Sequence, residues 1–275
     1  MITIVQSTYH PTLLTTITVI FSKKQIAVVS INEHKDILNN LFLLRIESDE
    51  YSNLPGLEEE LKETLPVEAI VRINPQPEKK VIILVTKEYH CLADILIRNE
   101  FKTLGASVQC VIGNYPVLSD LCERFGIPFH YITHEEKDKA TFEAGMLGII
   151  RQYKADYLVL AKFMRILSPE FFDHFPTRII NIHHSFLPAF AGANPYKRAY
   201  ERGVKLIGAT AHFVTPGLDE GPIITQQTAP VTHARSAADM IKTGREIETA
   251  VLSKALQLVF NDRVFIYDNK TFVFE

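Results

Sequence analysis

An amide, two imidazoles and a hydroxyl occur together in the segment NIHHSFLP, residues 181–188, at the end of an apolar run of strand length. In a β-strand alternate residues share a face, so Asn181 and His183 are expected to point to the same side. An amide donor beside an imidazole suits a reaction that passes through a tetrahedral oxyanion, because fixed donors must meet the charge that develops. For an isolated N-x-H segment, the simpler interpretation is that Asn181 satisfies backbone groups and His183 is a core histidine.

A second segment, LDEGPII at residues 218–224, places two carboxylates in a loop that enters an apolar strand. If Asp219 lies close to His183, it could hold and deprotonate a water molecule while the imidazole and the amide stabilise the product of its attack. Taken alone, the loop has an equally good structural explanation, which is an Asx-type turn with a solvated Glu220. The two segments together favour a catalytic site.

Short apolar runs separated by amphipathic helical segments begin at Lys79 and predict the sheet that would carry both segments. Runs rich in β-branched residues with helices between them are typical of a parallel sheet covered on both faces. In such doubly wound α/β folds, ligands bind outside the carboxyl ends of the strands, where the residues after YLVLAK and within IINIHH lie. We expect strands at VIILVT, SVQCVIG, YLVLAK and IINIH, an antiparallel ribbon of IGATAHFV and PIITQQTAPV, helices over residues 92–104, 117–125, 139–153 and 237–260, and a final hairpin of RVFIY and TFVFE.

The first 73 residues show a different order of elements. The strand-like segments ITIVQST, IAVVSI, LFLLRIE and EAIVRI alternate with helical segments near residues 13–21 and 57–65 in a βαββαβ order. That order packs two helices on one face of an antiparallel sheet. Two prolines within residues 74–78 exclude a helix there and predict an extended linker. The chain is therefore predicted to form two domains, residues 1–76 and residues 79–275.

The composition narrows the class of protein. Of the 275 residues, 47% are hydrophobic, which suffices for two buried cores. A formal net charge of -3 gives no reason to expect a nucleic-acid partner. Three cysteines without paired or CxxC spacing predict reduced thiols, as in a cytoplasmic protein, and no thiolate metal site. We recognise no targeting segment and no run approaching the roughly 18 apolar residues of a membrane span, so we expect no membrane partner.

Two other groups of residues could suggest different chemistry. An imidazole next to a thiol, as in His90–Cys91, can activate a nucleophile, but consecutive side chains rarely point at each other. Cys91 instead opens an amphipathic helix, where a small buried side chain is expected. His130 and His134 would align two metal ligands on a helix, but FHYITH predicts strand and loop, so zinc is not expected.

Three separated segments resemble the formyltransferases that depend on formyltetrahydrofolate, and within that family the formyltetrahydrofolate deformylases. They are NIHHSFLPAFAGANPYKRAYERGVKLIGATAHFV at 181–214, LDEGPII at 218–224, and VLAKFMRILSP at 159–169. The resemblance implies that the catalytic Asn, His and Asp of the family are Asn181, His183 and Asp219. It also implies a pocket whose contacts with the folate are made by Met164, Arg165, Ile166, Leu167, Glu220 and Gly221.

The turn after the first strand of the second domain bears on the choice between transfer to an amine and transfer to water. Glycinamide ribonucleotide transformylases have a Gly- and Ser-rich loop there, whose backbone amides cradle the phosphate of the acceptor. Here residues 87–92 contain no glycine, and Glu88 makes the turn a poor phosphate cradle. The segments VTKEYHCLADIL and HHSF match the deformylase pattern. The nucleic-acid-binding barrel and positive charge of methionyl-tRNA formyltransferases are not recognised.

The resemblance implies hydrolysis of 10-formyltetrahydrofolate to formate and tetrahydrofolate, with Asp219 activating water and Asn181 and His183 stabilising the oxyanion. The folate is then a substrate, and neither a metal nor another cofactor is expected. Two alternatives stay open. One is a formyltransferase that uses a small amine acceptor, and the other is a non-catalytic protein that binds folate or senses an amino acid.

The first domain resembles the ACT-type modules that precede the catalytic domain in deformylases. The glycine-containing motif that usually follows the first ACT strand is replaced here by residues 9–13, Tyr-His-Pro-Thr-Leu. That replacement argues against binding of an amino-acid effector, whereas a packing or oligomerising role survives. Because ACT modules often pair their sheets edge to edge, we expect a homo-oligomer, either a dimer or a tetramer.

Overall fold

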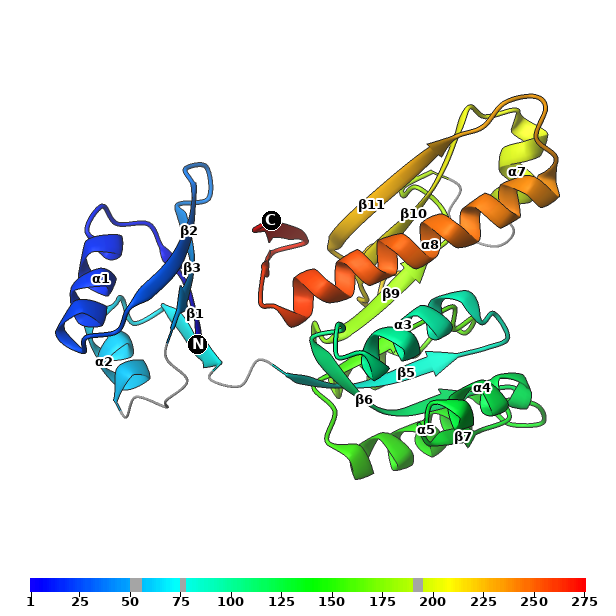
Figure 1. The fold of residues 1–275 in the computed structure, drawn as a ribbon, viewed down its shortest axis with the longest axis horizontal. Helices are drawn as coiled ribbons and strands as arrows, with labels where there is room; N and C mark the ends of the chain where they lie inside the picture. The colour runs from blue at the N-terminus through cyan, green and yellow to red at the C-terminus, as the bar shows by residue number, and fades with distance from the viewer. Residues whose placement is uncertain (50–55, 75–77, 190–194) are drawn as a thin grey trace. The chain divides into compact units, whose positions relative to one another are not determined.

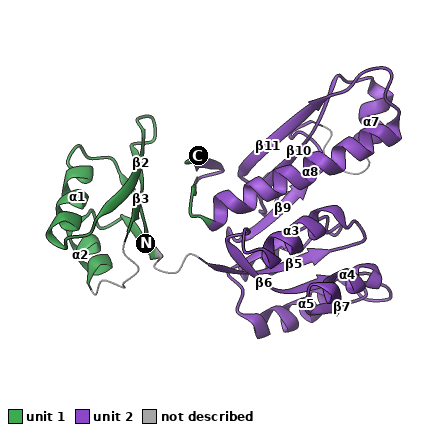
Figure 2. Cartoon of the chain, in the orientation of Figure 1, with its two compact units in different colours: residues 1–77, 261–265, 274–275 green, residues 78–260, 266–273 purple. Residues whose placement is uncertain are grey.

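The computed structural model describes residues 1–49, 56–74, 78–189 and 195–275. The chain divides into two compact units (Figure 2). The first unit comprises Met1–Pro77, Asn261–Phe265 and Phe274–Glu275, and the second comprises Glu78–Phe260 and Ile266–Val273. Of the linker predicted at residues 74–78, residues 75–77 lie outside the described residues.

The first unit has the predicted βαββαβ order, with both helices on one side of a four-stranded antiparallel sheet (Figure 1). Its elements are β1 (Ile2–Thr8), α1 (Leu13–Lys23), β2 (Val28–Asp36), β3 (Leu41–Ser48), α2 (Leu57–Thr64) and β4 (Ile70–Asn74), in the sheet order β2-β3-β1-β4. Phe42, Leu44 and Ile46 alternate along β3 and pack against the apolar faces of the helices, because residues two apart share one face of a strand. The predicted ACT-like arrangement is confirmed.

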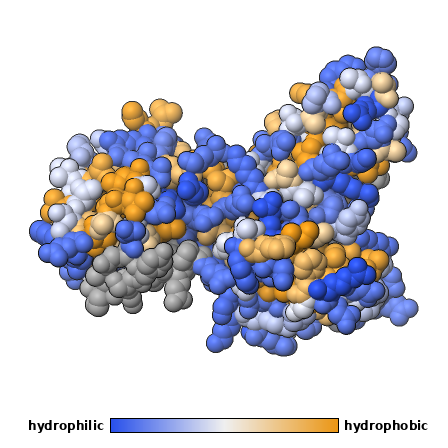
Figure 3. All heavy atoms as spheres, viewed as in Figure 1, coloured by the Kyte–Doolittle hydropathy of each residue, from blue (hydrophilic) through white to orange (hydrophobic). Residues whose placement is uncertain are grey.

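Strand β2 lies at the edge of this sheet, and its hairpin with β3 exposes apolar side chains. Val29 on β2 is 60% exposed, and Ile37 and Leu38 in the turn are 89% and 97% exposed. The tip of the hairpin forms a hydrophobic projection in Figure 3. An edge strand leaves a row of backbone N–H and C=O groups without strand partners, so this side of the unit is suited to pairing with another chain.

The second unit is built on a seven-stranded sheet with the order β11-β10-β9-β8-β5-β6-β7. The strands from β9 to β7 run parallel, whereas β10 and β11 are antiparallel, which confirms both the parallel sheet and the ribbon predicted from the sequence. Its strands are β5 (Lys79–Val85), β6 (Ala106–Gly113), β7 (Phe129–Tyr131), β8 (Tyr157–Leu160), β9 (Ile179–His183), β10 (Leu206–Phe213) and β11 (Ile223–Pro230). The chain ends in the predicted hairpin, β12 (Val264–Tyr267) with β13 (Lys270–Val273).

Helices connect these strands and cover the sheet (Figure 1). They are α3 (His90–Glu100), the short 3-10 helix η1 (Pro116–Leu118), α4 (Ser119–Arg124), α5 (Lys139–Tyr153), α6 (Pro169–Asp173), α7 (Pro195–Arg202) and α8 (Ala237–Phe260). Two of them, α6 and α7, were not predicted. Helix α3 ends four residues earlier than predicted because Lys102 adopts a left-handed conformation, with φ at 57°, which stops the helix. Of the described helices, none combines the length and the apolar character that a membrane span requires.

The central strands explain why this sheet is parallel and covered on both faces. The run Val81–Val85 is fully buried, which leaves no solvated face on β5. Ile82 and Leu84 pack with α5 through Met146 and with α6 through Phe171 in one core cluster. Helix α8 packs against β9, β10, β11 and α3. The carboxyl ends of β8 and β9 therefore open at one edge, where the chain carries its polar segments.

Candidate active site

Strand β9 presents the two predicted residues at its carboxyl end. Asn181 and His183 are separated by the buried Ile182, so the two polar side chains share one face of the strand, as predicted. Strand β10 runs antiparallel beside β9, and its register places Thr210 opposite His183 and His212 opposite Asn181. The imidazole of His183 is buried, and its Nε2 has no hydrogen-bond partner among the described residues.

The loop between β10 and β11 brings Asp219 to this imidazole. Oδ1 of Asp219 lies 3.2 Å from Nδ1 of His183, and the aspartate side chain is 10% exposed. Asp219 has a left-handed backbone, with φ at 58°, a conformation that Asp tolerates better than most residues. Burial by itself would raise the pKa of Asp219, but the hydrogen bond and charge of His183 outweigh burial and hold this pKa below its usual value. The residue is therefore an ionised carboxylate at neutral pH.

A third polar residue, His212, completes the cluster and was not predicted as a site residue. Its Nδ1 donates to the backbone carbonyl of Phe213 at 2.9 Å. Burial lowers the pKa of His212, so the ring is neutral and its Nε2 accepts a hydrogen bond from the amide nitrogen of Asn181 at 3.2 Å. Nε2 of His212 also lies 3.8 Å from Oδ1 of Asp219. His212 thus orients the Asn181 amide, and the second N–H of that amide stays available to a ligand.

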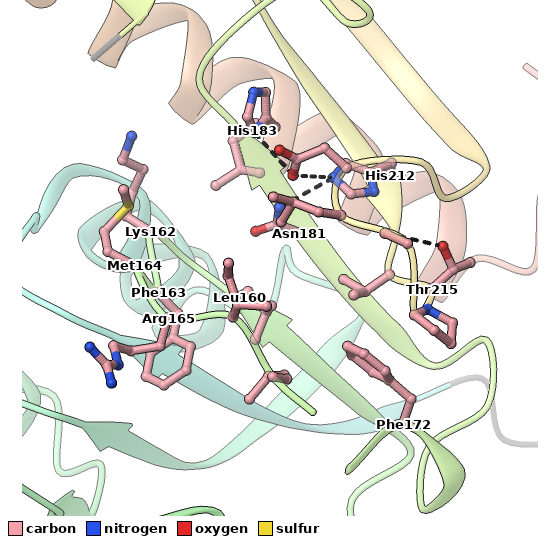
Figure 4. Close-up of a pocket in the computed structure, with 18 of the residues that line it drawn as sticks. Leu160, Lys162, Phe163, Met164, Arg165, Phe172, Asn181, His183, His212 and Thr215 are labelled. Atoms are coloured by element: carbon pink, nitrogen blue, oxygen red, sulfur yellow. Dashed lines mark hydrogen bonds and ion pairs between the residues drawn. The ribbon is translucent and has the colours of Figure 1, made fainter. Parts of the chain in front are cut away.

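These side chains border a cavity of about 250 Å³ (Figure 4). The segment that follows β8 forms its opposite wall, and all four of its predicted folate contacts line the cavity: Met164, Arg165, Ile166 and Leu167. The backbone N–H of Met164 donates to the hydroxyl of Thr86 at 2.9 Å, which ties this segment to the end of β5. Phe163 and Phe172 add aromatic surface. An apolar cavity with polar groups on one side suits a flat heterocycle that carries a reactive group at one end.

The other two predicted folate contacts do not line the cavity. Glu220 is exposed, and its backbone carbonyl accepts a hydrogen bond from the side-chain amide of Asn269 at 2.8 Å. Gly221 is buried, and a Cβ built on it would lie 1.7 Å from the carbonyl oxygen of Phe213. Only glycine allows that close approach of the two backbones, so Gly221 has a structural reason to be glycine. Their contacts with folate stay a prediction.

His184 lies between this cluster and a second group of polar residues. Its ring centroid is 5.1 Å from that of His183 and 6.3 Å from the ring of Tyr196. Burial, followed by the charge of Lys162, lowers the pKa of His184 to about 4, so the ring is neutral at pH 7. A neutral imidazole packed against His183 suits a residue that supports the site and does not itself react.

The residues set aside in the sequence have structural partners. Cys91 is buried in α3, and burial raises the pKa of its thiol far above neutral pH, so it is not an activated nucleophile. His130 lies on β7, and its Nε2 is 2.7 Å from the hydroxyl of Tyr153. Within the described residues, His90, Cys91 and Glu248 could meet at a metal ion. The ammonium of Lys162 already lies 3.1 Å from Glu248, however, and would repel a cation.

Comparison with known proteins agrees with this geometry. Residues 79–256 match the family model described as Formyl transferase. A formyltetrahydrofolate deformylase from Haemophilus influenzae is 47% identical over 261 residues, which cover 95% of this chain and 94% of that protein. The crystal structure of a formyltetrahydrofolate deformylase from Pseudomonas syringae has a TM-score of 0.93 at 33% identity and covers 100% of this chain and 94% of that one.

A structural neighbour with a different name covers a smaller share of the chain. Glycinamide ribonucleotide transformylase 1 from Symbiobacterium toebii has a TM-score of 0.69 at 28% identity, with 72% of this chain and 95% of that chain covered. The two proteins named deformylase, in contrast, match nearly the whole chain, the first unit included. This chain is therefore a member of the formyltetrahydrofolate deformylase family.

Proposed function

We propose that this enzyme hydrolyses 10-formyltetrahydrofolate to formate and tetrahydrofolate, with Asn181, His183 and Asp219 as its catalytic residues. The observation that carries the proposal is the contact between Asp219 and His183 at 3.2 Å, on the wall of a cavity whose other side is the predicted folate segment. In this arrangement the pteridine packs against residues 163–167. The formyl group then points toward β9.

Asp219 is suited to activate the attacking water. Its Oδ1 accepts a hydrogen bond from Nδ1–H of His183, so Oδ2 can accept one from water. As the water oxygen bonds to the formyl carbon, its proton passes to the carboxylate. Because the pKa of Asp219 lies below its usual value, the carboxylate is ionised and ready to take that proton over the whole neutral range.

Two groups can meet the negative charge that develops on the formyl oxygen. The second N–H of the Asn181 amide is one donor, and the first is held by His212. The other group is the His183 ring, whose Nε2 has no hydrogen-bond partner among the described residues and whose Nδ1 is held by Asp219 at 3.2 Å. When the intermediate collapses, the bond from the carbon to N10 breaks, N10 takes up a proton, and formate leaves.

Incubation of the purified enzyme with 10-formyltetrahydrofolate alone tests this function. We expect equal amounts of formate and tetrahydrofolate to form without any amine. Release that requires an amine would instead identify the alternative formyltransferase, and folate binding without formate would identify a binding protein. Since none of the proposed steps uses a metal, dialysis against EDTA is expected to leave turnover unchanged.

For the first unit, we infer an oligomerising role in place of effector binding. The inference is supported by the exposed edge strand β2 and by the apolar hairpin tip at Ile37 and Leu38. A homo-oligomer, dimer or tetramer, is expected in light scattering, and Ile37→Asp combined with Leu38→Asp should weaken it. Location in the cytoplasm stays a prediction from the three cysteines, which are all free and buried.

A further inference from the structure

Lys162, which follows β8, combines an unfavourable backbone with a buried charge. Its φ is 63°, in the left-handed region where a side chain crowds the next carbonyl oxygen and glycine is favoured. The residue is only 8% exposed, although lysine is almost never buried unless it is paired. Such a combination persists only where the surrounding structure stabilises it, and it is concentrated at functional sites.

The partner of Lys162 is a buried carboxylate on α8. Its ammonium lies 3.1 Å from Oε2 of Glu248, which is 1% exposed. Glu248 also accepts hydrogen bonds from Nε2 of His90 at 2.8 Å and from the hydroxyl of Tyr196 at 2.7 Å. Burial by itself would raise the pKa of Glu248. The hydrogen bond from His90, the charge of Lys162 and the hydrogen bond from Tyr196 outweigh burial and lower this pKa to about 2. Glu248 is therefore ionised.

These four residues line a second cavity, of about 210 Å³, beside the folate cavity. The two cavities share Lys162, Met164 and His184, so Lys162 lies in the wall between them. Figure 4 shows Lys162 beside Met164 at the margin of the folate cavity. At the outer side of the second cavity, Arg245 pairs with Glu88 at 2.9 Å, and the exposed Lys197 lies near Glu201.

An ionised, buried carboxylate in the cavity beside the folate cavity is a group that would bind an amine. N–H donors form strong hydrogen bonds with an ionised carboxylate, the more so away from water. An amine held there would compete with water for the formyl carbon. In this chain the corresponding place on Glu248 is taken by an amine of the chain itself, the side chain of Lys162.

We propose that Lys162 determines the acceptor of the formyl group, because its ammonium occupies the place on Glu248 where a small primary amine would bind. Water is then left as the acceptor. This inference rests on the proposed hydrolysis and adds to it a reason for the choice of acceptor. In the excluded reaction the amine nitrogen would bond to the formyl carbon, the bond from that carbon to N10 would break, and the proton lost by the amine would end on N10.

The test replaces Lys162 with glycine, which suits the left-handed backbone, and separately with alanine. Each variant is incubated with 10-formyltetrahydrofolate and glycinamide at pH 8, where an α-amino group with a pKa of about 8 is partly neutral. Formate and N-formylglycinamide are measured by mass spectrometry against a blank without enzyme. We expect the ratio of N-formylglycinamide to formate to rise about tenfold or more in both variants.

Two matched variants serve as controls. Lys162→Arg keeps the charge and the bulk, and Lys197→Ala removes a lysine from the exposed rim of the same cavity. Both are expected to keep the wild-type ratio. An unchanged ratio in Lys162→Gly and Lys162→Ala, with formate release retained, overturns the proposal.

Calorimetric titration with glycinamide, without any formyl donor, gives a second readout that needs no turnover. We expect binding to folded Lys162→Gly and none to the wild-type enzyme. Equal binding to the two proteins overturns the proposal even where the variant is inactive. If the wild-type enzyme released no formate, the proposed hydrolysis would fail, whereas this comparison would still decide the role of Lys162.

Discussion

Replacement of Asp219 by asparagine separates the chemical step from folate binding. The amide has nearly the same shape as the carboxylate, and its oxygen can still accept the hydrogen bond from Nδ1 of His183. In the wild type these two atoms lie 3.2 Å apart. The left-handed backbone at this position is tolerated by asparagine as by aspartate. We therefore expect the variant to fold like the wild type. What it lacks is the negative charge and the capacity to take a proton.

The loss of turnover can be estimated from these two deficits. A positioned general base contributes about 10²- to 10⁴-fold to the rate. The lost charge adds to this, because at 3.2 Å a carboxylate attracts a unit of positive charge developing on the imidazole by about 1 kcal/mol in water and about 5 kcal/mol at an effective dielectric constant of 20. For a carboxylate that is 10% exposed, we take a value between these limits. We expect kcat to fall by about 10³-fold or more.

Folate binding should persist in Asp219→Asn because the proposed folate contacts are made by residues 163–167, on the opposite wall of the cavity. The assay compares single-turnover formate release with the Kd for tetrahydrofolate. Glu100→Gln, the same exchange of carboxylate for amide at an exposed position on α3, is expected to match the wild type. Turnover within tenfold of the wild type, or a loss of folate affinity that accounts for the whole effect, would refute the assigned role of Asp219.

Further predictions concern the donors and the buried network. Asn181→Ala should lower kcat by about 10²- to 10³-fold with little change in KM, as measured in steady-state kinetics. His212→Phe removes the acceptor that orients the Asn181 amide, and the loss of that hydrogen bond should cost about 1 kcal/mol, or roughly fivefold in kcat, without loss of folate affinity. The pKa of Glu248 is lower in the folded protein than its ordinary value of 4.5, so ionised Glu248 stabilises the fold at pH values above 4.5. This contribution is lost as the pH falls toward 2. This shift of the pKa from 4.5 to about 2 corresponds to about 3 kcal/mol. Denaturant unfolding should therefore show that Glu248→Gln is less stable than the wild type at pH 7. The difference in stability should shrink at pH 3.

Several features of the structure follow from residues that are close together in the sequence. Helix α5 has the predicted bounds because its start is set by a local cap, in which the Asp138 side chain accepts a hydrogen bond from the backbone N–H of Thr141. The shared face of Asn181 and His183 follows from the two-residue period of a strand. The continuous apolar run of β5 likewise predicts burial on both faces.

Contacts between residues far apart in the sequence depend instead on how the elements pack. His212 joins the site through the register between β9 and β10, and one residue of slip would turn its side chain to the other face. The partners of Glu248 come from α3, α7 and the segment after β8, which no local pattern connects. The left-handed backbone of Lys162 is equally invisible in its residue type, because lysine disfavours that conformation. Local propensity is a property of neighbours in sequence, whereas these contacts depend on how packed elements align in space.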